Sequence, residues 1–199
     1  MLEMLNPEYR FSSLLMITPE WMRRHNFKVL LMDIDNTLLP RNNSVVPDNH
    51  LSWLRMMQNQ GIAIVMASNN GGNRVASIER QLKEKGIAIP ILTWAGKPFP
   101  PAYAGAIRLL EITPIVKTND LPRYSDCILA AGDQLFTDVL GAHWYNLPVA
   151  LLHPLSSNDF IGTKVLRILE HCVIWYLKKQ SIFPEEDNVN IKIDTSVKI

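Results

Sequence analysis

Short apolar runs alternate with amphipathic stretches along most of the chain. The runs lack the polar-apolar alternation of a half-exposed strand and are too short for helices, which is typical of strands buried on both faces. Five such strands are expected, at residues 29–32, 62–67, 89–94, 127–131 and 148–152. The stretches between them have helical spacing and are too long for hairpins. This pattern predicts an α/β fold, a three-layer sandwich around a mainly parallel, Rossmann-like sheet with right-handed crossovers.

The alternating pattern divides the chain into three parts. Residues 27–155 form the predicted core domain, preceded by an N-terminal extension at 1–26 that contains a short helix. Residues 156–199 are expected to form a C-terminal helix and a polar tail. The polar, proline-bearing segment at 112–126 is interpreted as a surface loop, whose role the sequence leaves open.

The N-terminal extension carries a clear helix start. Thr18, Pro19 and Glu20 combine an N-cap residue, a proline at the first helical position and an acid in the first turn. The apolar residues 14–17 and Trp21 could pack on the core or rest on a membrane. Core packing is favoured, because an interfacial helix would show a continuous basic face.

The C-terminal helix is expected at about 163–179 and carries an apolar stripe. We expect this stripe to pack on the domain. It consists of Val165, Leu166, Leu169, Cys172, Val173 and Tyr176.

Composition narrows the function classes. A chain of 199 residues with 47% hydrophobic residues can bury one substantial core, and a net charge of +1 gives no electrostatic case for nucleic acid as a partner. Cys127 and Cys172 lack metal-ligand spacing and are interpreted as buried thiols in a reducing cytoplasm. No apolar run approaches the roughly 20 residues that span a bilayer. We therefore expect a cytoplasmic protein, soluble or peripheral to the membrane. The five histidines show no metal-like spacing, so no zinc is assigned.

Two carboxylates follow the first predicted strand directly. Asp33 and Asp35 stand one residue apart in the string Asp-Ile-Asp-Asn-Thr, and Thr37 adds a supporting hydroxyl. Carboxylates this close repel each other unless a cation, a proton or backbone N–H groups hold them. One interpretation is an ordinary turn with capping hydrogen bonds. The other is a nucleophile and a proton shuttle that work with a metal ion.

Polar residues also follow three later strands. Ser68 and Asn69 follow the second strand, Lys97 the third, and Asp133 and Asp138 the fourth. The carboxyl ends of parallel strands meet at one rim, so residues far apart in sequence can converge there. Each residue alone also fits a structural role, as a turn residue, a surface lysine or a helix N-terminal acid. Their occurrence after successive strands favours a site for a phosphoryl group.

The predicted set is chemically coherent for phosphoryl transfer. Carboxylates supply the hard oxygen ligands that Mg²⁺ prefers. Ser68 and backbone N–H groups around Asn69 can hold phosphate oxygens, and Lys97 provides a positive charge. Asp33 is the candidate nucleophile, which would form an aspartyl phosphate. Asp35 is the candidate acid that protonates the leaving alkoxide and then activates water.

These strings resemble the four motifs of the haloacid dehalogenase (HAD) superfamily, at 33–37, Ser68, Lys97 and 132–138. More closely, the chain is similar to class IIIA phosphatases of the YqeG type, which are related to mitochondrial phosphatidylglycerophosphate phosphatase. The similarity covers about residues 5–172 and includes the strings Ser-Asn-Asn and Gly-Lys-Pro. It also includes a tail pattern, Thr-Lys-x-x-Arg-x-x-Glu.

The resemblance implies a Mg²⁺-dependent phosphomonoesterase with a HAD-like catalytic core. Asp33 would be both nucleophile and metal ligand, and Asp35 the acid/base that binds metal through its carbonyl. Asp133 would ligate Mg²⁺, and Asp138 would support it directly or through water. The chain departs from the pattern at Leu166, where Asn is frequent, and in the longer loop that begins at Ile112.

The spacing of the motifs bears on the substrate. About thirty residues separate the first motif from the second and the second from the third. This leaves room for a strand and a helix between motifs but not for a large cap domain. An open site could accept a small molecule, a phosphate on a macromolecule or a lipid headgroup at a membrane face. The family suggests phosphatidylglycerophosphate. Soluble sugar, nucleotide or protein phosphates stay open as alternatives.

Two further classes of function compete with a phosphatase. A signalling receiver domain also forms an aspartyl phosphate, although a domain that keeps its phosphate would lack a proton donor at Asp35. A binding module without turnover is the other alternative. The sequence gives no oligomeric state.

Overall fold

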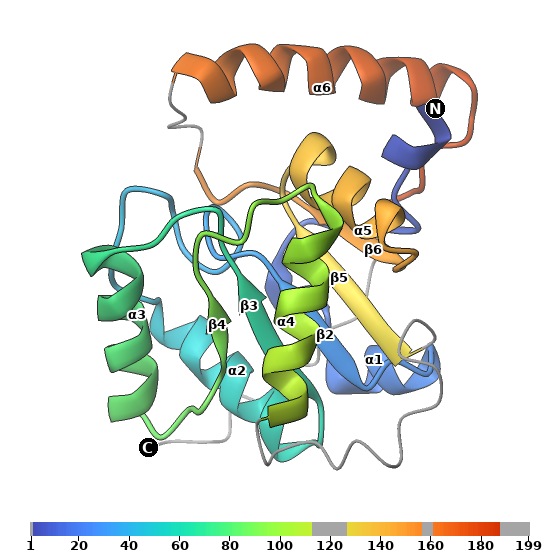
Figure 1. Ribbon diagram of the computed structural model, residues 1–199. Helices are drawn as coiled ribbons and strands as arrows, with labels where there is room; N and C mark the ends of the chain where they lie inside the picture. Colours follow the sequence, from blue (N-terminus) through green and yellow to red (C-terminus); the bar gives the residue numbers. More distant parts are fainter. Residues whose placement is uncertain (1, 113–126, 157–160, 188–199) are drawn as a thin grey trace.

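The computed structural model describes residues 2–112, 127–156 and 161–187. In its sheet the strands lie in the order β1, β6, β5, β2, β3 and β4, and every pairing among them is parallel (Figure 1). This confirms the prediction of an α/β fold around a mainly parallel sheet. The strands are β1 (Tyr9–Phe11), β2 (Val29–Met32), β3 (Ala63–Ala67), β4 (Ile91–Leu92), β5 (Ile128–Gly132) and β6 (Val149–Leu152).

Helices cover both faces of the sheet and complete three layers (Figure 1). One face carries α1 (Pro19–Arg24), α2 (Asp48–Asn59) and α3 (Asn73–Glu84). The other carries α4 (Pro100–Ile112) and α5 (Leu140–Trp144), whereas α6 (Ile161–Lys179) lies across the carboxyl ends of the strands and contacts the loop after β5 (Figure 1). Shorter turns are η1 (Leu2–Leu5), η2 (Leu14–Met16) and the π-helical η5 (Leu135–Val139).

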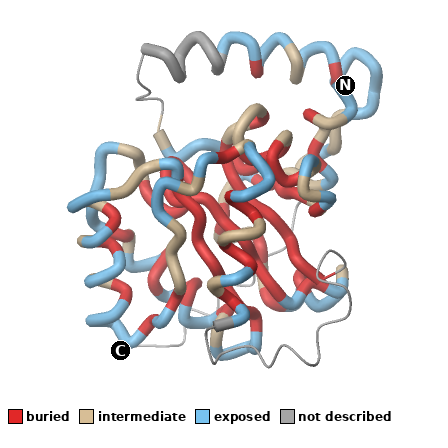
Figure 2. The backbone as a smooth tube through the Cα atoms, viewed as in Figure 1, coloured by how far each residue is buried: buried red, intermediate tan, exposed pale blue. Residues whose placement is uncertain are grey.

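The central strands are buried on both faces, as the red tube in Figure 2 shows. In β2, Leu30 and Met32 pack in the cluster that contains α1, α2 and α3, whereas Val29 and Leu31 pack in the cluster with α4 and α5. Full burial of such a side chain contributes about 1.5–3 kcal/mol each. This two-sided burial explains the unbroken apolar run before Asp33.

The sheet has a sixth strand, β1, that the five-strand prediction missed. Tyr9 pairs with Ala150 and Phe11 with Leu152, so β1 forms an edge beside β6. Three residues are too few to show a periodicity, which is why the sequence pattern gave no signal. The third predicted strand, at 89–94, is also shorter than expected, since β4 contains two residues.

The N-terminal helix forms as predicted. The Thr18 hydroxyl accepts a hydrogen bond from the Trp21 backbone N–H at 3.1 Å, and Pro19 occupies the first helical position. Leu14 and Ile17 are buried, together with Trp21. The expected packing of this segment on the core is therefore confirmed.

The C-terminal helix α6 contacts the domain through a different face from the one expected. Glu170 and Leu177 are buried, and Val173 and Ile174 pack against the core, which is a face with i, i+3, i+4, i+7 spacing. The predicted apolar stripe included Val173, whose packing is confirmed, but it missed the rest of this face because the first residue of the face is charged.

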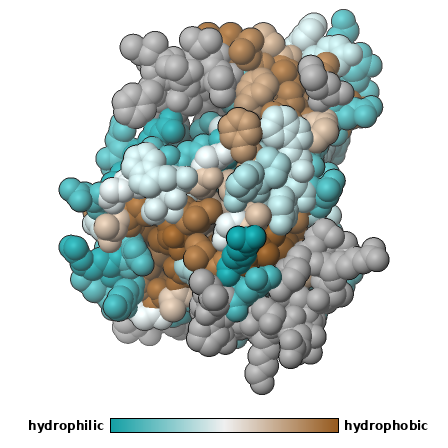
Figure 3. Space-filling view, in the orientation of Figure 1, coloured by the Kyte–Doolittle hydropathy of each residue, from teal (hydrophilic) through white to brown (hydrophobic). Residues whose placement is uncertain are grey.

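Three residues of the predicted stripe are exposed instead: Leu169, Cys172 and Tyr176. Their expected packing on the domain was wrong, and so was the expectation of a buried thiol at Cys172, whereas Cys127 is buried. The side chains of Val165 and Leu166 lie outside the described part of the structure, as does the loop at 113–126. Figure 3 shows apolar side chains at the surface along α6.

Candidate active site

The carboxyl ends of the strands carry the predicted site residues, and the structure brings them together. Asp33 directly follows β2, and Lys97 follows β4 by a short turn. The Lys97 ammonium donates to Asp33 Oδ1 at 2.6 Å and to Asp138 Oδ1 at 2.7 Å. All three side chains belong to residues that are no more than 7% exposed. One cation thus bridges carboxylates from two different loops.

Burial dominates the electrostatics of this group. Burial raises the pKa of Asp33 to about 7, since the favourable effect of Lys97 only partly offsets it and Asp138 adds repulsion. Burial alone would lower the pKa of Lys97, but Asp138 and Asp33 together raise it. Lys97 therefore stays charged, whereas Asp33 needs further positive charge nearby to be fully ionised.

Asp35 faces a different set of partners, from the loop after β3 and from α3. Its Oδ1 pairs with Arg74 Nη1 at 2.7 Å, and its Oδ2 accepts from Asn70 Nδ2 at 2.6 Å. The fully buried Ser68 hydroxyl lies 3.4 Å from the same Oδ2 and accepts the Asn70 backbone N–H at 3.0 Å. Asp35 and Ser68 therefore stand together, as the sequence predicted, on the β3 side of Asp33.

Asn69 makes contacts that the sequence did not suggest. Its Oδ1 accepts the Lys97 backbone N–H at 2.7 Å, and its Nδ2 donates to the Lys97 carbonyl at 2.9 Å. This pair of hydrogen bonds fixes the backbone from which the Lys97 ammonium reaches Asp33. The Asn69 side chain thus positions Lys97, and a contact with phosphate is left to backbone N–H groups of this loop.

Asp138 folds back against the end of β5. Its Oδ2 accepts the Gln134 backbone N–H at 3.1 Å, while its Oδ1 is held by Lys97. A side chain at Gly132 would overlap the Asp138 carboxyl group, so this approach requires glycine. Between Asp133 and α5 the expected helix begins as the π-helical turn η5, a distortion frequent at functional sites.

Glu170 connects α6 to this same loop. Its Oε1 accepts the backbone N–H groups of Leu135, at 2.8 Å, and of Phe136, at 3.5 Å. Glu170 is 3% exposed. A buried carboxylate from the C-terminal helix thereby helps to hold the loop that carries Asp133 and Asp138.

The Asp-Ile-Asp-Asn-Thr loop is tied to the segment after β6. Asn36 adopts a left-handed conformation with φ 57°, and its Oδ1 accepts the Ser156 hydroxyl at 2.7 Å and the Arg41 N–H at 3.2 Å. Its carbonyl accepts the Leu155 N–H at 3.0 Å. Thr37 is 1% exposed and lies inside this loop. These bonds fix the loop in which Asp33 and Asp35 stand.

Three residues of the site escaped the sequence-based set: Asn70, Arg74 and Glu170. Asn70 is the last residue of the Ser-Asn-Asn string and Glu170 ends the tail pattern, so both had a signal that was not used. Arg74 lies at the start of α3 and had none. A cation that neutralises a carboxylate from another element becomes visible only in three dimensions.

The acidic groups at the rim fit a magnesium ion. No group of three or more His, Cys, Asp or Glu side chains in the described residues is arranged to enclose a metal by itself. The carboxylates of Asp33 and Asp133 nevertheless follow adjacent strands, and both residues are buried. Mg²⁺ is commonly held by one or two carboxylates, with water and phosphate oxygens in the other positions. Carboxylate oxygens of this kind suit Mg²⁺ better than they suit Zn²⁺.

This combination of fold and rim defines the class of protein. A parallel sheet gathers an Asp-x-Asp pair, a buried serine, a lysine and a second acidic loop at one edge, as in the phosphatases of the HAD superfamily. The chain belongs to the mitochondrial PGP phosphatase family, whose model matches residues 3–155. It is a phosphatase.

The chain is similar to a curated relative and to two solved structures. It is 29% identical over 174 residues to "Probable phosphatase YqeG" of Bacillus subtilis, which covers 87% of this chain and 92% of that protein. A 3-deoxy-D-manno-octulosonate 8-phosphate phosphatase from Moraxella catarrhalis, solved with magnesium and phosphate ions, is 18% identical, with a TM-score of 0.46 over 82% of this chain and 94% of that one. A haloacid dehalogenase-like hydrolase from Brucella suis is 12% identical, with a TM-score of 0.45 over 72% and 93%.

Proposed function

We propose that the chain is a Mg²⁺-dependent phosphomonoesterase that works through an aspartyl phosphate on Asp33 and acts on phosphatidylglycerophosphate. The main support is the position of the Lys97 ammonium, 2.6 Å from Asp33 and 2.7 Å from Asp138. A lysine held there can offset negative charge on the nucleophile and on the transferred phosphoryl group. Family membership supports the choice of substrate.

The proposed reaction has two steps. In the first, an Asp33 carboxylate oxygen bonds to phosphorus, the bond from phosphorus to the substrate oxygen breaks, and Asp35 gives that oxygen a proton. In the second, water attacks the phosphorus of the aspartyl phosphate and loses a proton to Asp35. Phosphate leaves, and the Asp33 carboxylate and protonated Asp35 are restored. Ser68, beside Asp35, can donate to a phosphoryl oxygen during both steps.

The remaining residues of the rim have supporting roles in this proposal. When bound, Mg²⁺ would offset the negative charge of the phosphoryl group, held by the carboxylates of Asp33 and Asp133 and by the Asp35 carbonyl. Asp138 holds the Lys97 ammonium and the Gln134 N–H, which favours support of the site over direct metal ligation. Thr37 stays a predicted supporting residue inside the loop.

The surroundings of the site favour a substrate with a bulky, partly apolar body. The exposed side chains of Trp94 and Phe99 lie on either side of Lys97 in the sequence, and the Phe99 ring lies 6.3 Å from that of Trp144, which is also exposed. Exposed aromatic rings suit contact with a lipid surface. Within the described residues, no helix combines the length and apolar character needed to cross a bilayer. The exposed aromatic rings lead us to include peripheral contact with a membrane, on the cytoplasmic side, in the proposal.

Phosphate release from p-nitrophenyl phosphate and from short-chain phosphatidylglycerophosphate tests this function. We expect Mg²⁺-dependent turnover of both, and Asp33→Asn should abolish it because the carboxylate nucleophile is lost. Asp48→Asn is the matched control, since Asp48 is exposed at the start of α2.

Two results would contradict parts of the proposal. Full activity of Asp33→Asn would reject the nucleophile, and turnover of soluble esters without turnover of the lipid would reject the substrate. Phosphorylation without release would instead indicate the receiver-type alternative.

A further inference from the structure

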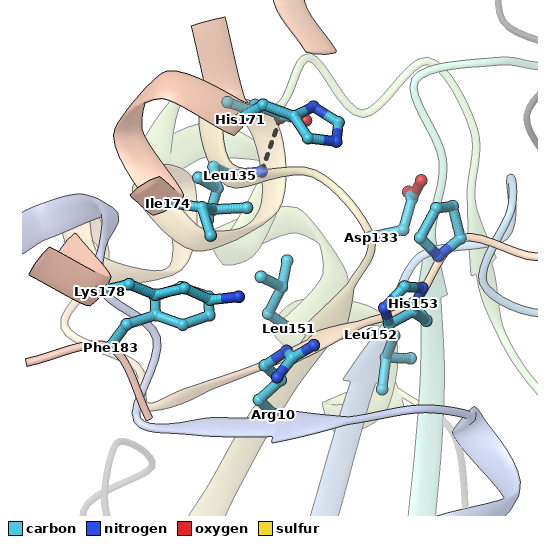
Figure 4. A pocket seen from close by; sticks show the side chains of 12 residues that line it. Arg10, Asp133, Leu135, Leu151, Leu152, His153, His171, Ile174, Lys178 and Phe183 are labelled. Carbon is cyan, nitrogen blue, oxygen red and sulfur yellow. Dashed lines mark hydrogen bonds between the residues drawn. The ribbon is translucent and has the colours of Figure 1, made fainter. Parts of the chain in front are cut away.

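A cavity of about 240 Å³ lies between β6, β1 and α6, beside the proposed active site (Figure 4). Asp133, at the end of β5, lines it, so the cavity begins where the catalytic rim ends. In the sheet, β5 separates β2, which carries Asp33, from β6 and β1. Neighbouring strands lie about 4.8 Å apart, so the cavity begins on the order of 10 Å from the nucleophile.

Two cations from different elements line this cavity. Arg10 of β1 and Lys178 of α6 each lie 5.8 Å from the centre of the Phe183 ring. Figure 4 shows the ends of both side chains in the space between α6 and β6. Arg10 also pairs with Glu186, but only at 3.7 Å and with both side chains partly exposed. Such a pair contributes little to stability, and cation–π contacts of partly exposed cations add little more, so fold stability is a weak reason for gathering two cations here.

The other walls of the cavity are mostly apolar. They come from Leu151 at the end of β6, Leu135 of η5 and Ile174 of α6, with the Phe183 ring at one side. Two acidic residues also line the cavity: Glu170 has its carboxylate turned to the N–H groups of Leu135 and Phe136, and Asp133 lies at the end next to the proposed active site. The cavity therefore offers positive charge beside apolar surface, next to a site for a phosphate monoester.

We propose that this cavity is the subsite for the leaving group of the substrate, and that Arg10 and Lys178 bind a second anionic group on it. This inference rests on the proposed phosphatase site and narrows its substrate class to phosphate monoesters with a further negative charge. The apolar walls would cover the carbon chain between the two anionic groups. A phospholipid headgroup and a soluble bisphosphate share this chemistry.

Matched substrates isolate the contribution of a second anionic group to kcat/KM. Propane-1,3-diol bisphosphate and propyl phosphate differ only in the second phosphate, and short-chain phosphatidylglycerophosphate carries its second anionic group as a singly charged phosphodiester on a lipid. For the wild type we expect a higher kcat/KM with the bisphosphate than with propyl phosphate. A higher kcat/KM for the lipid than for the bisphosphate would identify the headgroup as the source of the anion, and the reverse order would identify a soluble substrate. Equal values for the bisphosphate and propyl phosphate would overturn the subsite.

Charge-removing variants identify the residues. Arg10→Gln and Lys178→Gln should each raise KM for the bisphosphate and for the lipid roughly tenfold, which is the effect of one lost charged hydrogen bond. Their kcat/KM for p-nitrophenyl phosphate should be unchanged, because this ester has no second anion. An equal loss on p-nitrophenyl phosphate would mean that the residues support the fold, and would overturn the proposal.

Glu186→Gln is the decisive control for Arg10. It removes the ion pair but leaves the cation, so KM for the bisphosphate should stay the same or fall. If KM rose as much as in Arg10→Gln, the effect of Arg10→Gln would come from the lost ion pair. That result would contradict anion binding by Arg10.

A binding measurement separates this inference from the proposed function. In Asp33→Asn, calorimetry with propane-1,3-diol bisphosphate should show binding that Lys178→Gln weakens roughly tenfold. Loss of turnover in the wild type with this binding intact would reject the proposed reaction and keep the subsite. Binding that Lys178→Gln leaves unchanged would reject the subsite alone.

Discussion

At the scale of single residues, the site depends on one ammonium between two buried carboxylates. Lys97 has little contact with solvent to compensate its charge, so Asp33 and Asp138 stabilise it, and it stabilises them. Removing Lys97 would leave two uncompensated buried carboxylates, whereas removing either aspartate would leave a single ion pair. The geometry of this trio is therefore a requirement of the fold as well as of the proposed chemistry.

Gly132→Ala tests how closely Asp138 must approach the end of β5. The added methyl group would overlap the Asp138 carboxyl group and push it away from Lys97. We expect kcat/KM for p-nitrophenyl phosphate to fall about 100-fold, the usual effect of a misplacement near 1 Å, with an unchanged circular dichroism spectrum. Gly105→Ala in α4 is the control, since its methyl group meets only the end of the Leu92 side chain. Wild-type kcat/KM in Gly132→Ala would contradict this account of Asp138.

At the scale of elements, loops at the rim are held by residues from distant segments. Asn69 fixes Lys97, Ser156 fixes Asn36, and Glu170 fixes the turn at Leu135. The short strand β1 is held in a similar way, because Glu8 accepts the Val149 N–H at the start of β6, at 2.8 Å. Side-chain links thus add to the stability of elements that are short or lie at an edge.

Glu170→Ala tests the link between α6 and the acidic loop. It removes the acceptor of the buried Leu135 N–H and of the partly buried Phe136 N–H, so the free energy of unfolding should fall by about 1–3 kcal/mol, as measured by urea denaturation. Glu170→Gln keeps an oxygen acceptor and should lose less. Exposed Glu185→Ala serves as the control. Equal stability of Glu170→Ala and the wild type would show that α6 does not hold this loop.

The Glu8–His143 pair predicts a pH-dependent link at the β1 edge. His143 Nδ1 faces the Met4 carbonyl at 2.8 Å and Nε2 faces Glu8 at 3.1 Å, so both nitrogens must donate and the ring must be charged. Burial alone would shift both groups toward their neutral forms, but their mutual contact raises the pKa of His143 and lowers that of Glu8. The stabilisation is therefore largest between the ordinary values of 4.5 and 6.5. It is lost as the pH rises through the pKa of folded His143 or falls through that of Glu8.

Urea denaturation of the wild type and Glu8→Gln checks this pH dependence. The difference in unfolding free energy should reach no more than about 1 kcal/mol near pH 5.5 and should shrink near pH 8.5. A difference that stays constant between these two pH values would contradict a charged pair.

At the scale of the whole molecule, the sequence predicted the features that recur along the chain, such as buried strands followed by polar residues. It missed features that occur only once. The buried runs and the polar residues after them indicated the parallel sheet and the convergence of Asp33, Lys97 and Asp138, because a parallel topology places strand ends at one rim. The strand β1, with three residues, had no periodicity to detect. The contact of Arg74 with Asp35, and the face of α6 that begins with a buried glutamate, depend on tertiary packing that no local pattern encodes.

The central claim is that Asp33 becomes phosphorylated during turnover, and trapping that intermediate tests it most directly. Asp35→Asn should still accept a phosphoryl group from p-nitrophenyl phosphate, whose leaving group needs no proton, but should release it slowly because the proposed activator of water is gone. Mass spectrometry of rapidly quenched protein with Mg²⁺ should then find one added phosphoryl group on Asp33. An unmodified Asp33 in a variant that releases a burst of p-nitrophenol, or a phosphoryl group on a different residue, would contradict the account.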